Sequence, residues 1–414
     1  MSRNDVLTDL LGLQGWEADT AGIRMDGDTV TVPIRRQCGH GYECSRCGER
    51  LLACYDHQPK RLVRDLPVWG RRCFLEFIPV RVDCPRCRKV TAERLEWVES
   101  HQRMTLRYEL YAARLCGILP ALDVAALEGL GKDAVYRLDR KWLLRREAKR
   151  EPRPVRRLGI DEIALRKGQC YATVFYDLER REVIGMVKGR RQRQVSGFFR
   201  RWGKERCRQV EVVCMDMWSA YANSVRIHLK KADIVFDKFH IYSYLSVAID
   251  TVRRGEQNNA SKEGKQLIKG SRWLWLKKRE GLKRRQKRTL QEIMAANGNL
   301  QKAYLLKEDF ERFYESADAQ EAEAFLEEWS GRCKESGLQP FARVAQRLLR
   351  RTKGVLAYFK HKITNAVSEG INNKIKVLKR RAYGFHDMEY FRLKIMDITG
   401  NLPPIEAVAH SYPE

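Results

Sequence analysis

The feature that most restricts how this chain can fold is a cluster of cysteines near its start. Seven of its twelve cysteines lie within a stretch of 50 residues. Two pairs among them, Cys44/Cys47 and Cys84/Cys87, have the Cys-x-x-Cys spacing, in which two thiolates bind one ion from a tight turn. Two such turns complete a tetrahedral Zn²⁺ site with no open position for water. We therefore expect residues 1–100 to form a module around a structural zinc ion.

Other residues of ligand type in the same stretch leave the ligand set open. Five of them could hold a second ion or replace one of the four cysteines: Cys38, His40, Cys54, His57 and Cys73. The alternative is that the two pairs are unrelated thiols in a reduced core. Between the pairs, the run Arg72–Val82 has the composition of a strand, and we expect it to form a hairpin that brings the two turns together. The five remaining cysteines are scattered and are expected to be small buried residues.

The charge of the chain points to a polyanionic partner. Its 414 residues include 80 Lys and Arg against 53 Asp and Glu, for a formal net charge of +27. Because 43% of the residues are hydrophobic, the chain can still bury a sizeable core, and its length suits two to four domains of roughly 100–200 residues. No apolar run reaches the roughly 18 residues of a membrane span, and the first residues lack the features of a signal peptide. We therefore expect a cytoplasmic, multidomain protein that binds nucleic acid.

Residues 101–150 have helical periodicity. Three helices are predicted, at Met104–Gly117, Ala121–Leu127 and Lys132–Arg146, with a glycine-containing turn before the last. This order is typical of a helix-turn-helix, whose last helix enters the major groove. The candidate DNA-contacting residues on that helix are Lys132, Tyr136, Arg137, Arg140 and Lys141. The alternative is a plain three-helix bundle with a solvated basic face, which the net charge makes less favourable.

A linker at 151–154, rich in proline, leads into a region of mixed α/β pattern. Five strands are expected, at Arg157–Ile163, Tyr171–Tyr176, Glu182–Val187, Val210–Met215 and Ala232–Phe236. Asp161 and Asp216 are expected at the ends of two of them. Two strand ends of this kind, with a third acid from a helix, can hold two Mg²⁺ ions that act on a phosphodiester.

The third acid is expected near the end of the chain. Glu369 is the best candidate, although spacing alone does not select it. Basic residues that could follow a phosphate backbone come after it: Lys374, Lys376, Arg380 and Arg381. From about Tyr242 to Val355 the pattern is helical, and residues 250–290 carry 14 Lys and Arg against 4 Asp and Glu. That segment, with Trp273 and Trp275, is predicted either to bind DNA or to be a solvated helix with two core tryptophans.

Together, short motifs spread along the chain resemble those of the ISL-three family of bacterial insertion-sequence transposases, which are of the DDE type. The resemblance covers nearly the whole chain in order. Its motifs are the two cysteine pairs with Arg64-Asp-Leu-Pro67 between them, the helix-turn-helix, Gly159-Ile-Asp161-Glu162, Met215-Asp216-Met217 with Tyr221, Ile234-Val-Phe-Asp237-Lys-Phe-His240, Ser368-Glu369-Gly-Ile-Asn372-Asn373-Lys-Ile-Lys376, and Arg380-Arg381-Ala-Tyr383-Gly384-Phe385.

The resemblance implies the fold class: an α/β multidomain protein whose RNase H-like mixed-sheet core carries a large helical insertion. The implied domains are a zinc-binding module (1–100), a helix-turn-helix (101–150), the first part of the core (155–244), the insertion (245–355), a second part of the core with the glutamate helix (356–400) and a tail (401–414). It also implies a catalytic triad of Asp161, Asp216 and Glu369 that holds two Mg²⁺ (or Mn²⁺) ions. His240 is implied to lie near the scissile phosphate, with a packed strand-end histidine as the alternative. Glu162 is expected on the opposite face of its strand.

The implied function is transposition of an insertion sequence. The protein would bind the terminal inverted repeats as a homodimer or larger assembly, near the nucleoid, and would cut and join DNA by metal-dependent phosphodiester chemistry. Two alternatives remain open from the sequence: an RNase H-like nuclease without strand transfer, and a domesticated zinc and helix-turn-helix regulator that only binds DNA.

Overall fold

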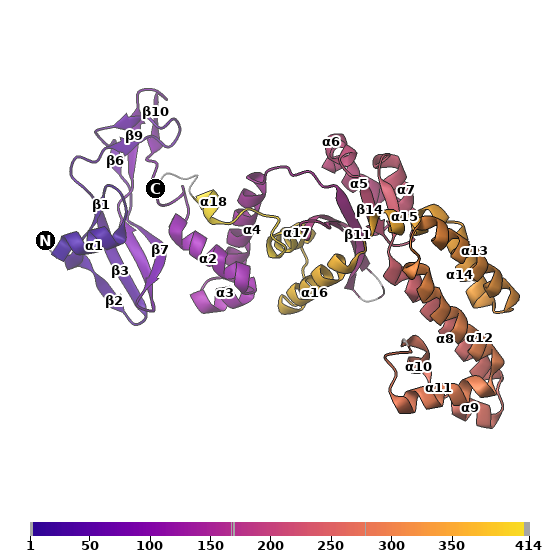
Figure 1. Ribbon diagram of the computed structural model, residues 1–414. Helices are drawn as coiled ribbons and strands as arrows, with labels where there is room; N and C mark the ends of the chain where they lie inside the picture. Colours follow the sequence, from indigo (N-terminus) through magenta and orange to yellow (C-terminus); the bar gives the residue numbers. More distant parts are fainter. Residues whose placement is uncertain (1–2, 167, 169, 278, 410–414) are drawn as a thin grey trace. The chain divides into compact units, whose positions relative to one another are not determined.

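The computed structural model describes residues 3–166, 168, 170–277 and 279–409. The chain folds into two compact units, whose elements are labelled in Figure 1. The first unit comprises Met1–Glu151 and Lys379–Glu414, and the second comprises Pro152–Leu378. The boundary after Glu151 falls in the proline-containing linker that the sequence predicts.

A five-stranded sheet forms the base of the first unit. Its order is β1-β3-β8-β7, with β2 paired to β3. Alternate residues of β3, Val30, Val32 and Ile34, are buried, as the two-residue period of a strand requires, and they share a core with Leu75 and Phe77. The elements are α1 (Arg3–Leu11), β1 (Trp16–Ala18), η1 (Thr20–Gly22), β2 (Arg24–Asp26), β3 (Thr29–Arg36), β7 (Arg61–Val68) and β8 (Arg71–Phe77).

Two small hairpins carry the Cys-x-x-Cys turns. The first pairs β4 (Tyr42–Glu43) with β5 (Arg50–Leu51), and the second pairs β9 (Val80–Cys84) with β10 (Lys89–Ala92). Strand β6 (Asp56–His57) extends the second hairpin in the order β10-β9-β6.

The expectation that Arg72–Val82 forms one hairpin between the turns is wrong. The run is divided between β8 and β9, which belong to different sheets. Pro79 lies between the two strands, and proline cannot donate to a strand ladder. The second turn instead lies within the β9–β10 hairpin.

The three helices predicted for residues 101–150 are confirmed. They are α2 (Leu106–Ile118), α3 (Ala121–Glu128) and α4 (Lys132–Ala148). Gly129 ends α3 with φ +61°, a left-handed conformation in which glycine is the preferred residue. The turn between α3 and α4 is therefore the tight glycine turn of a helix-turn-helix.

The end of the chain returns to this bundle. Helix α17 (Met388–Ile398) packs against α4, with Tyr390, Leu393 and Met396 in one core with Leu143, and the short α18 (Glu406–Ala409) follows. Residues 356–400 were expected to form one catalytic segment, whereas the chain from Lys379 onward groups with the first unit. The other domain limits remain predictions.

A mixed five-stranded sheet forms the centre of the second unit, and all five predicted strands are present. Its order is β13-β12-β11-β14-β15. The first three strands are antiparallel, and β14 and β15 run parallel to β11. The elements are β11 (Arg157–Arg166), β12 (Cys170–Asp177), β13 (Glu182–Lys188), α5 (Gln192–Trp202), α6 (Lys204–Arg208), β14 (Val212–Met215), α7 (Ser219–His228) and β15 (Asp233–Phe236).

Helices follow β15, as the pattern over residues 242–355 predicts. Their core is continuous with that of the sheet, since Phe236 of β15, Ile241 and Trp329 belong to one buried cluster. The helices are α8 (Lys238–Asn259), α9 (Lys262–Ile268), α10 (Arg272–Leu276), α11 (Arg284–Ala296), α12 (Gly298–Asp309), η2 (Phe310–Glu315), α13 (Ala319–Glu335), α14 (Gln339–Leu349), α15 (Thr352–His361) and α16 (Ala366–Arg381). Among the described residues, no helix is both long enough and apolar enough to cross a bilayer.

Candidate active site and zinc site

Two parallel strands bring the first two predicted acids to the same edge of the sheet. Strands β11 and β14 pair in register up to Ile160 and Met215, so Asp161 and Asp216 are the next residues on each. Asp161 does not end its strand, as the sequence suggested, because β11 continues to Arg166 against β12. What ends before Asp161 is the pairing with β14, whose last partners are Ile160 and Met215.

His240 completes a cluster with these two acids. One ligand atom each of Asp161, Asp216 and His240 lie within 4.8 Å of one another. Nε2 of His240 lies 2.7 Å from the buried Oδ1 of Asp216. His240 stands in the first turn of α8, whose N-cap is Asp237. The helix therefore begins where the sheet ends and directs the imidazole at the carboxylates.

The electrostatics of this cluster favour a cation. Burial raises the pKa of the Asp161 carboxyl, and the negative charge of Asp216 contributes further, so that the pKa is about 6. Burial lowers the pKa of His240, but the contact with Asp216 and the charges of the nearby acids outweigh it and raise the pKa overall. Two carboxylates held close together in a buried site repel each other, and a bound divalent cation relieves that repulsion.

Helix α16 is docked on the same edge of the sheet by side chains that the sequence did not single out as functional. Nδ2 of Asn365, just before the helix, donates to the carbonyl of Ile160 over 3.2 Å. Its backbone N–H donates to Oδ1 of Asp237 over 3.1 Å. A Cβ on Gly159 would lie 2.7 Å from Cδ2 of Leu178 and 3.2 Å from Oδ1 of Asn365, so the glycine of the predicted Gly159-Ile-Asp161 motif permits both close approaches.

A second asparagine of α16 contacts the acid cluster directly. Asn372 donates through Nδ2 to Oδ2 of Asp161 over 2.9 Å and accepts through Oδ1 from the Tyr176 hydroxyl over 2.6 Å. Asn365, Ser368 and Asn372 recur at helical spacing and are all buried. That spacing of small polar residues was visible in the sequence and could have identified the face that packs on the sheet.

Glu369 lies on this helix, but the structure does not bring its carboxylate into the cluster. Its side chain is exposed, and the grouped ligand atoms come from Asp161, Asp216 and His240. Glu369 is four residues from Asn365 and three from Asn372, so it stands beside the contacting face of α16. Glu162 pairs with Arg190, over 3.1 Å, in agreement with its expected direction away from Asp161.

The four predicted zinc ligands converge. The Sγ atoms of Cys44, Cys47, Cys84 and Cys87 all lie within 4.8 Å of one another. Cys47 and Cys84 are 3.5 Å apart, and Cys44 and Cys87 are 4.0 Å apart. Sulfurs on a tetrahedral zinc ion at about 2.3 Å would be about 3.8 Å apart. The donor set therefore fits Zn²⁺ in a closed, structural site.

The local backbone prepares each turn for metal binding. The residue after each pair, Gly48 or Arg88, has a positive φ, at +74° and +53°, and its N–H donates to the carbonyl of the first cysteine. Burial raises the pKa of Cys44, but the Thr91 hydroxyl and the N–H groups of the turn lower it to about 6 overall. A thiolate is the form that binds zinc.

The five alternative zinc ligands do not assemble a second site within the described part of the chain. None of Cys38, His40, Cys54, His57 and Cys73 belongs to a group of ligand atoms close enough to share an ion. Cys38 is exposed and Cys73 is buried in the core of the large sheet. Of the scattered cysteines, Cys116, Cys207, Cys214 and Cys333 are buried as expected, and Cys170 is half-buried.

The candidate DNA-contacting residues of α4 divide into two groups. Lys132 and Arg137 are exposed. Lys141 instead binds Glu99 and Glu109 through Nζ, over 2.7 and 2.6 Å. The other two candidates, Tyr136 and Arg140, face α17.

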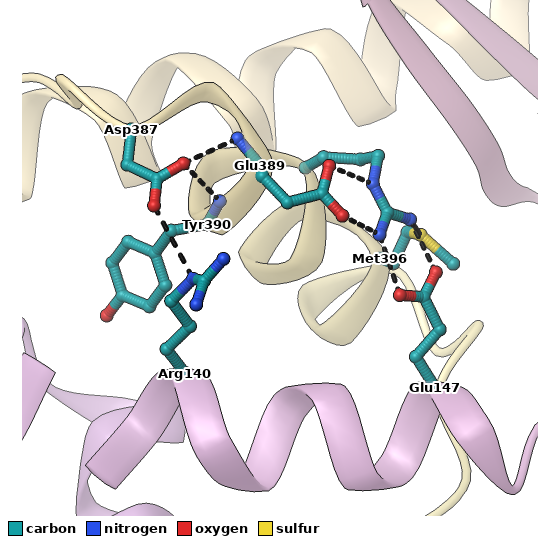
Figure 2. A network of polar contacts seen from close by, with 7 residues as sticks. Arg140, Glu147, Asp387, Glu389, Tyr390 and Met396 are labelled. Carbon is teal, nitrogen blue, oxygen red and sulfur yellow. Dashed lines mark hydrogen bonds and ion pairs between the residues drawn. The ribbon is translucent and has the colours of Figure 1, made fainter. Parts of the chain in front are cut away.

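Figure 2 shows this contact, with Arg140 of α4 directed at Asp387, the N-cap of α17. Nε of Arg140 lies 3.5 Å from Oδ2 of Asp387, and the Tyr136 hydroxyl donates to the same carboxylate. Two turns further along α4, Glu147 accepts from Arg392 over 2.6 and 2.7 Å. With Lys141, three of the five predicted DNA contacts are thus occupied by the protein itself.

The basic candidates further along the chain are exposed, namely Lys374, Lys376, Arg380 and Arg381. In the basic segment of residues 250–290, the two tryptophans differ in exposure. Trp275 is fully buried and donates to Ser271 over 2.9 Å, whereas Trp273 is exposed beside Arg272. The alternative of two core tryptophans is therefore wrong for Trp273.

Comparison with known proteins agrees with these sites. Residues 158–395 match the DDE-type family described as a transposase, and residues 93–143 match the helix-turn-helix domain of transposase family ISL3. The two matches define the class: a transposase with a DDE domain and a helix-turn-helix. The chain belongs to the ISL3 family of insertion-sequence transposases.

Curated relatives cover almost the whole chain. The transposase for insertion sequence element IS1001 of Bordetella parapertussis is 35% identical over 85% of this chain and 87% of its own length. The transposase for insertion sequence element IS1557 of Mycobacterium tuberculosis, found in two strains, is 26% identical over 96% of this chain and 94% of its own length.

Proposed function

We propose that this protein binds the terminal inverted repeats of an insertion sequence, cuts the DNA there and joins the ends to a target. The observation that carries the proposal is the cluster of Asp161, Asp216 and His240 at the edge of a mixed sheet, in a chain that belongs to a transposase family. The sheet with two acids on adjacent parallel strands is what an RNase H-like core requires. The run of helices from α8 to α15, between β15 and α16, supports a helical insertion at about the predicted residues 245–355.

In this proposal, Asp161 and Asp216 hold divalent metal, Mg²⁺ or Mn²⁺, and Glu369 supplies the third carboxylate by moving from its exposed position beside the docked face of α16. A bound pair of such ions would activate the attacking oxygen and stabilise the leaving oxygen of the phosphodiester. Asp161 is held by Asn372, and α16 is held by Asp237 through Asn365. These contacts orient the carboxylates before metal and DNA arrive.

His240 is proposed to act beside the scissile phosphate. Its pKa is raised by Asp216 and the neighbouring acids despite burial, which favours the imidazolium. A cation in that position can attract a phosphate oxygen or transfer a proton to it. The bound metal and His240 would share Asp216, so the imidazole is expected to turn toward the phosphate when metal binds.

The first unit is proposed to bind the ends of the element. Lys132 and Arg137 on α4 are exposed and would contact DNA. The zinc ion would stabilise the module that precedes the helix-turn-helix in the chain. The exposed lysine and arginine side chains in the second half of α16 would contact DNA phosphates. Two ends must be cut and joined, so a homodimer or larger assembly on DNA is expected. A protein of this kind would act at the bacterial nucleoid.

The test is cleavage of end-containing DNA by purified protein with Mg²⁺ or Mn²⁺. Asp216→Asn removes the charge without changing size, and we expect cleavage to fall by at least roughly 10³-fold while end binding is kept. Glu162→Gln is the matched control, because its carboxylate pairs with Arg190 away from the cluster. Full cleavage by the Asp216 variant would refute the assignment.

The runner-up function is an RNase H-like nuclease that cuts without joining. Pre-cut ends with a 3′-hydroxyl and a supercoiled target plasmid separate the two, because only a transposase inserts those ends. A domesticated regulator would bind the ends and do neither, and the half-buried pair of Asp161 and Asp216 argues against it.

A further inference from the structure

An exposed tryptophan stands at the tip of the β7–β8 hairpin. Val68 pairs with Arg71 across a two-residue turn formed by Trp69 and Gly70. Both have positive φ, +49° and +76°, as in a type I′ turn, where Asn-Gly is the favoured pair. Trp69 is 86% exposed. A large aromatic residue is thus placed in a left-handed conformation without any burial that would explain it.

The tip of the hairpin is basic and is held in place. Arg71 is exposed and donates to the Gly27 carbonyl over 3.0 Å. Arg72 pairs with Asp28 over 2.6 Å. Both contacts fix the hairpin to the neighbouring β2–β3 turn.

The same hairpin is attached to the helix-turn-helix. A Cβ on Gly129, in the turn between α3 and α4, would lie 3.2 Å from Nη1 of Arg72. Further along β7, buried Arg64 lies 3.5 Å from Glu128, the last residue of α3. Glu128 also accepts from the Tyr108 hydroxyl over 2.9 Å.

Asp65, next to Arg64, adds a second attachment. Its Oδ1 accepts from the Thr105 hydroxyl and from Nε of Arg107, both over 2.7 Å. Thr105 is the N-cap of α2. The Arg64-Asp65 pair, part of the Arg64-Asp-Leu-Pro67 motif, therefore connects the strand that carries the tip to helices α2 and α3.

We propose that the β7–β8 hairpin is a wing of the helix-turn-helix, and that Trp69 contacts duplex DNA next to the groove occupied by α4. The inference rests on the proposed binding of the element's ends. Arg72 lies against Gly129 in the turn that leads into Lys132, the first residue of α4, so the hairpin lies near the N-terminal end of that helix. Elements placed beside a recognition helix reach the adjacent minor groove or backbone.

Duplex DNA is the partner that the charges favour. Arg71, two residues after Trp69, is exposed, Lys132 is exposed at the start of α4, and the chain has a net charge of +27. An apolar ring among cations suits a polyanion with stacked bases, where the ring can enter a groove while the cations contact phosphates.

The informative variant is Trp69→Asn. Asparagine accepts the left-handed turn better than tryptophan, so the melting temperature should stay equal or rise. The dissociation constant for fluorescein-labelled duplexes of about 40 bp from the element's termini should increase roughly tenfold. Trp69→Phe keeps an apolar ring and should retain most of the affinity. Leu52→Asn, which removes another exposed apolar side chain of the first unit, is the matched control and should bind normally.

In hydroxyl-radical footprints, Trp69→Asn should lose protection at one edge of the protected DNA region. The protection due to α4 should be kept. Unchanged affinity and footprint in that variant would overturn the wing. A change in oligomeric state by light scattering, with normal DNA affinity, would also overturn it and assign Trp69 to a protein contact. If the unmodified chain does not bind the duplexes, the proposed binding of the element's ends is wrong, whatever the role of Trp69.

Discussion

Asn372 donates a hydrogen bond to Asp161 over 2.9 Å, although the two residues are separated by 211 positions in the chain. The same amide accepts from Tyr176 on β12. One side chain of α16 thus fixes the orientation of a carboxylate of the proposed metal site and attaches the helix to the sheet.

Replacing Asn372 by alanine should weaken both structure and catalysis. The Tyr176 hydroxyl would lose its partner in a buried setting, at a cost of about 1–3 kcal/mol, and Asp161 would lose a contact that orients it. We expect cleavage to fall about 10–100-fold, the usual effect of losing such a partner. Asn373→Ala is the control, since Asn373 is exposed. Equal rates for the two variants would contradict the role of Asn372.

Metal binding should depend on pH through Asp161. Its carboxyl pKa is raised from 3.8 to about 6 by burial and by Asp216. Without metal, this group stabilises the fold below about pH 4, and the contribution is lost as the pH rises through 6. A divalent cation must displace the proton, so its apparent dissociation constant should rise about tenfold per pH unit below 6.

The measurement is the Mg²⁺ or Mn²⁺ dependence of the melting temperature between pH 5 and 8. The metal-free protein should be prepared by dialysis without chelator, so that zinc is kept. Asp216→Asn removes a proposed ligand of the same ion, so the rise in melting temperature on adding metal should be largely lost at every pH. A metal affinity that is flat between pH 5 and 7 would exclude Asp161 as a ligand.

Cys84→Ser should remove one zinc ion per chain. Structural zinc contributes about 10–16 kcal/mol in small modules, as much as the whole stability of a typical domain, about 5–15 kcal/mol. We therefore expect the hairpins around the site to lose their structure and become protease-sensitive. Cys38→Ser, at an exposed cysteine outside the site, should keep one zinc by elemental analysis. Two zinc ions per chain in the unmodified protein would instead indicate a second zinc site.

Asp387→Ala should test the contact between α17 and α4. Asp387 caps α17 by accepting from two backbone N–H groups and also binds Tyr136 and Arg140. Loss of a cap costs about 1 kcal/mol, and loss of the two side-chain contacts should add about 1–2 kcal/mol. Asp318→Ala removes an N-cap with two backbone partners and should show the cap cost alone. The free energies of unfolding come from urea titrations, and equal losses would mean that the contacts to α4 contribute nothing.

Much of the local structure was predictable. The five strands of the second unit are short apolar runs bounded by polar residues, and the helices of the first have apolar residues at helical spacing. Both patterns reflect burial on one face of a regular element, which is a local property. The zinc ligands were predictable for a similar reason, because two residues of spacing place both thiolates in one turn.

The prediction was less successful where a residue's role depends on a distant partner. Tyr136, Arg140 and Lys141 have the composition of a DNA-contacting face, yet they contact Asp387, Glu99 and Glu109. The run Arg72–Val82 has the composition of one hairpin and is shared by two sheets.

The order of residues along the chain determined which segments become strands, helices and metal-binding turns, because those depend on neighbours within a few positions. Only the tertiary structure decided that His240 joins Asp161 and Asp216, that Asn372 rather than Glu369 contacts Asp161, and that α17 packs on α4. Such contacts join segments far apart in the chain, and side-chain packing between them selects the partners.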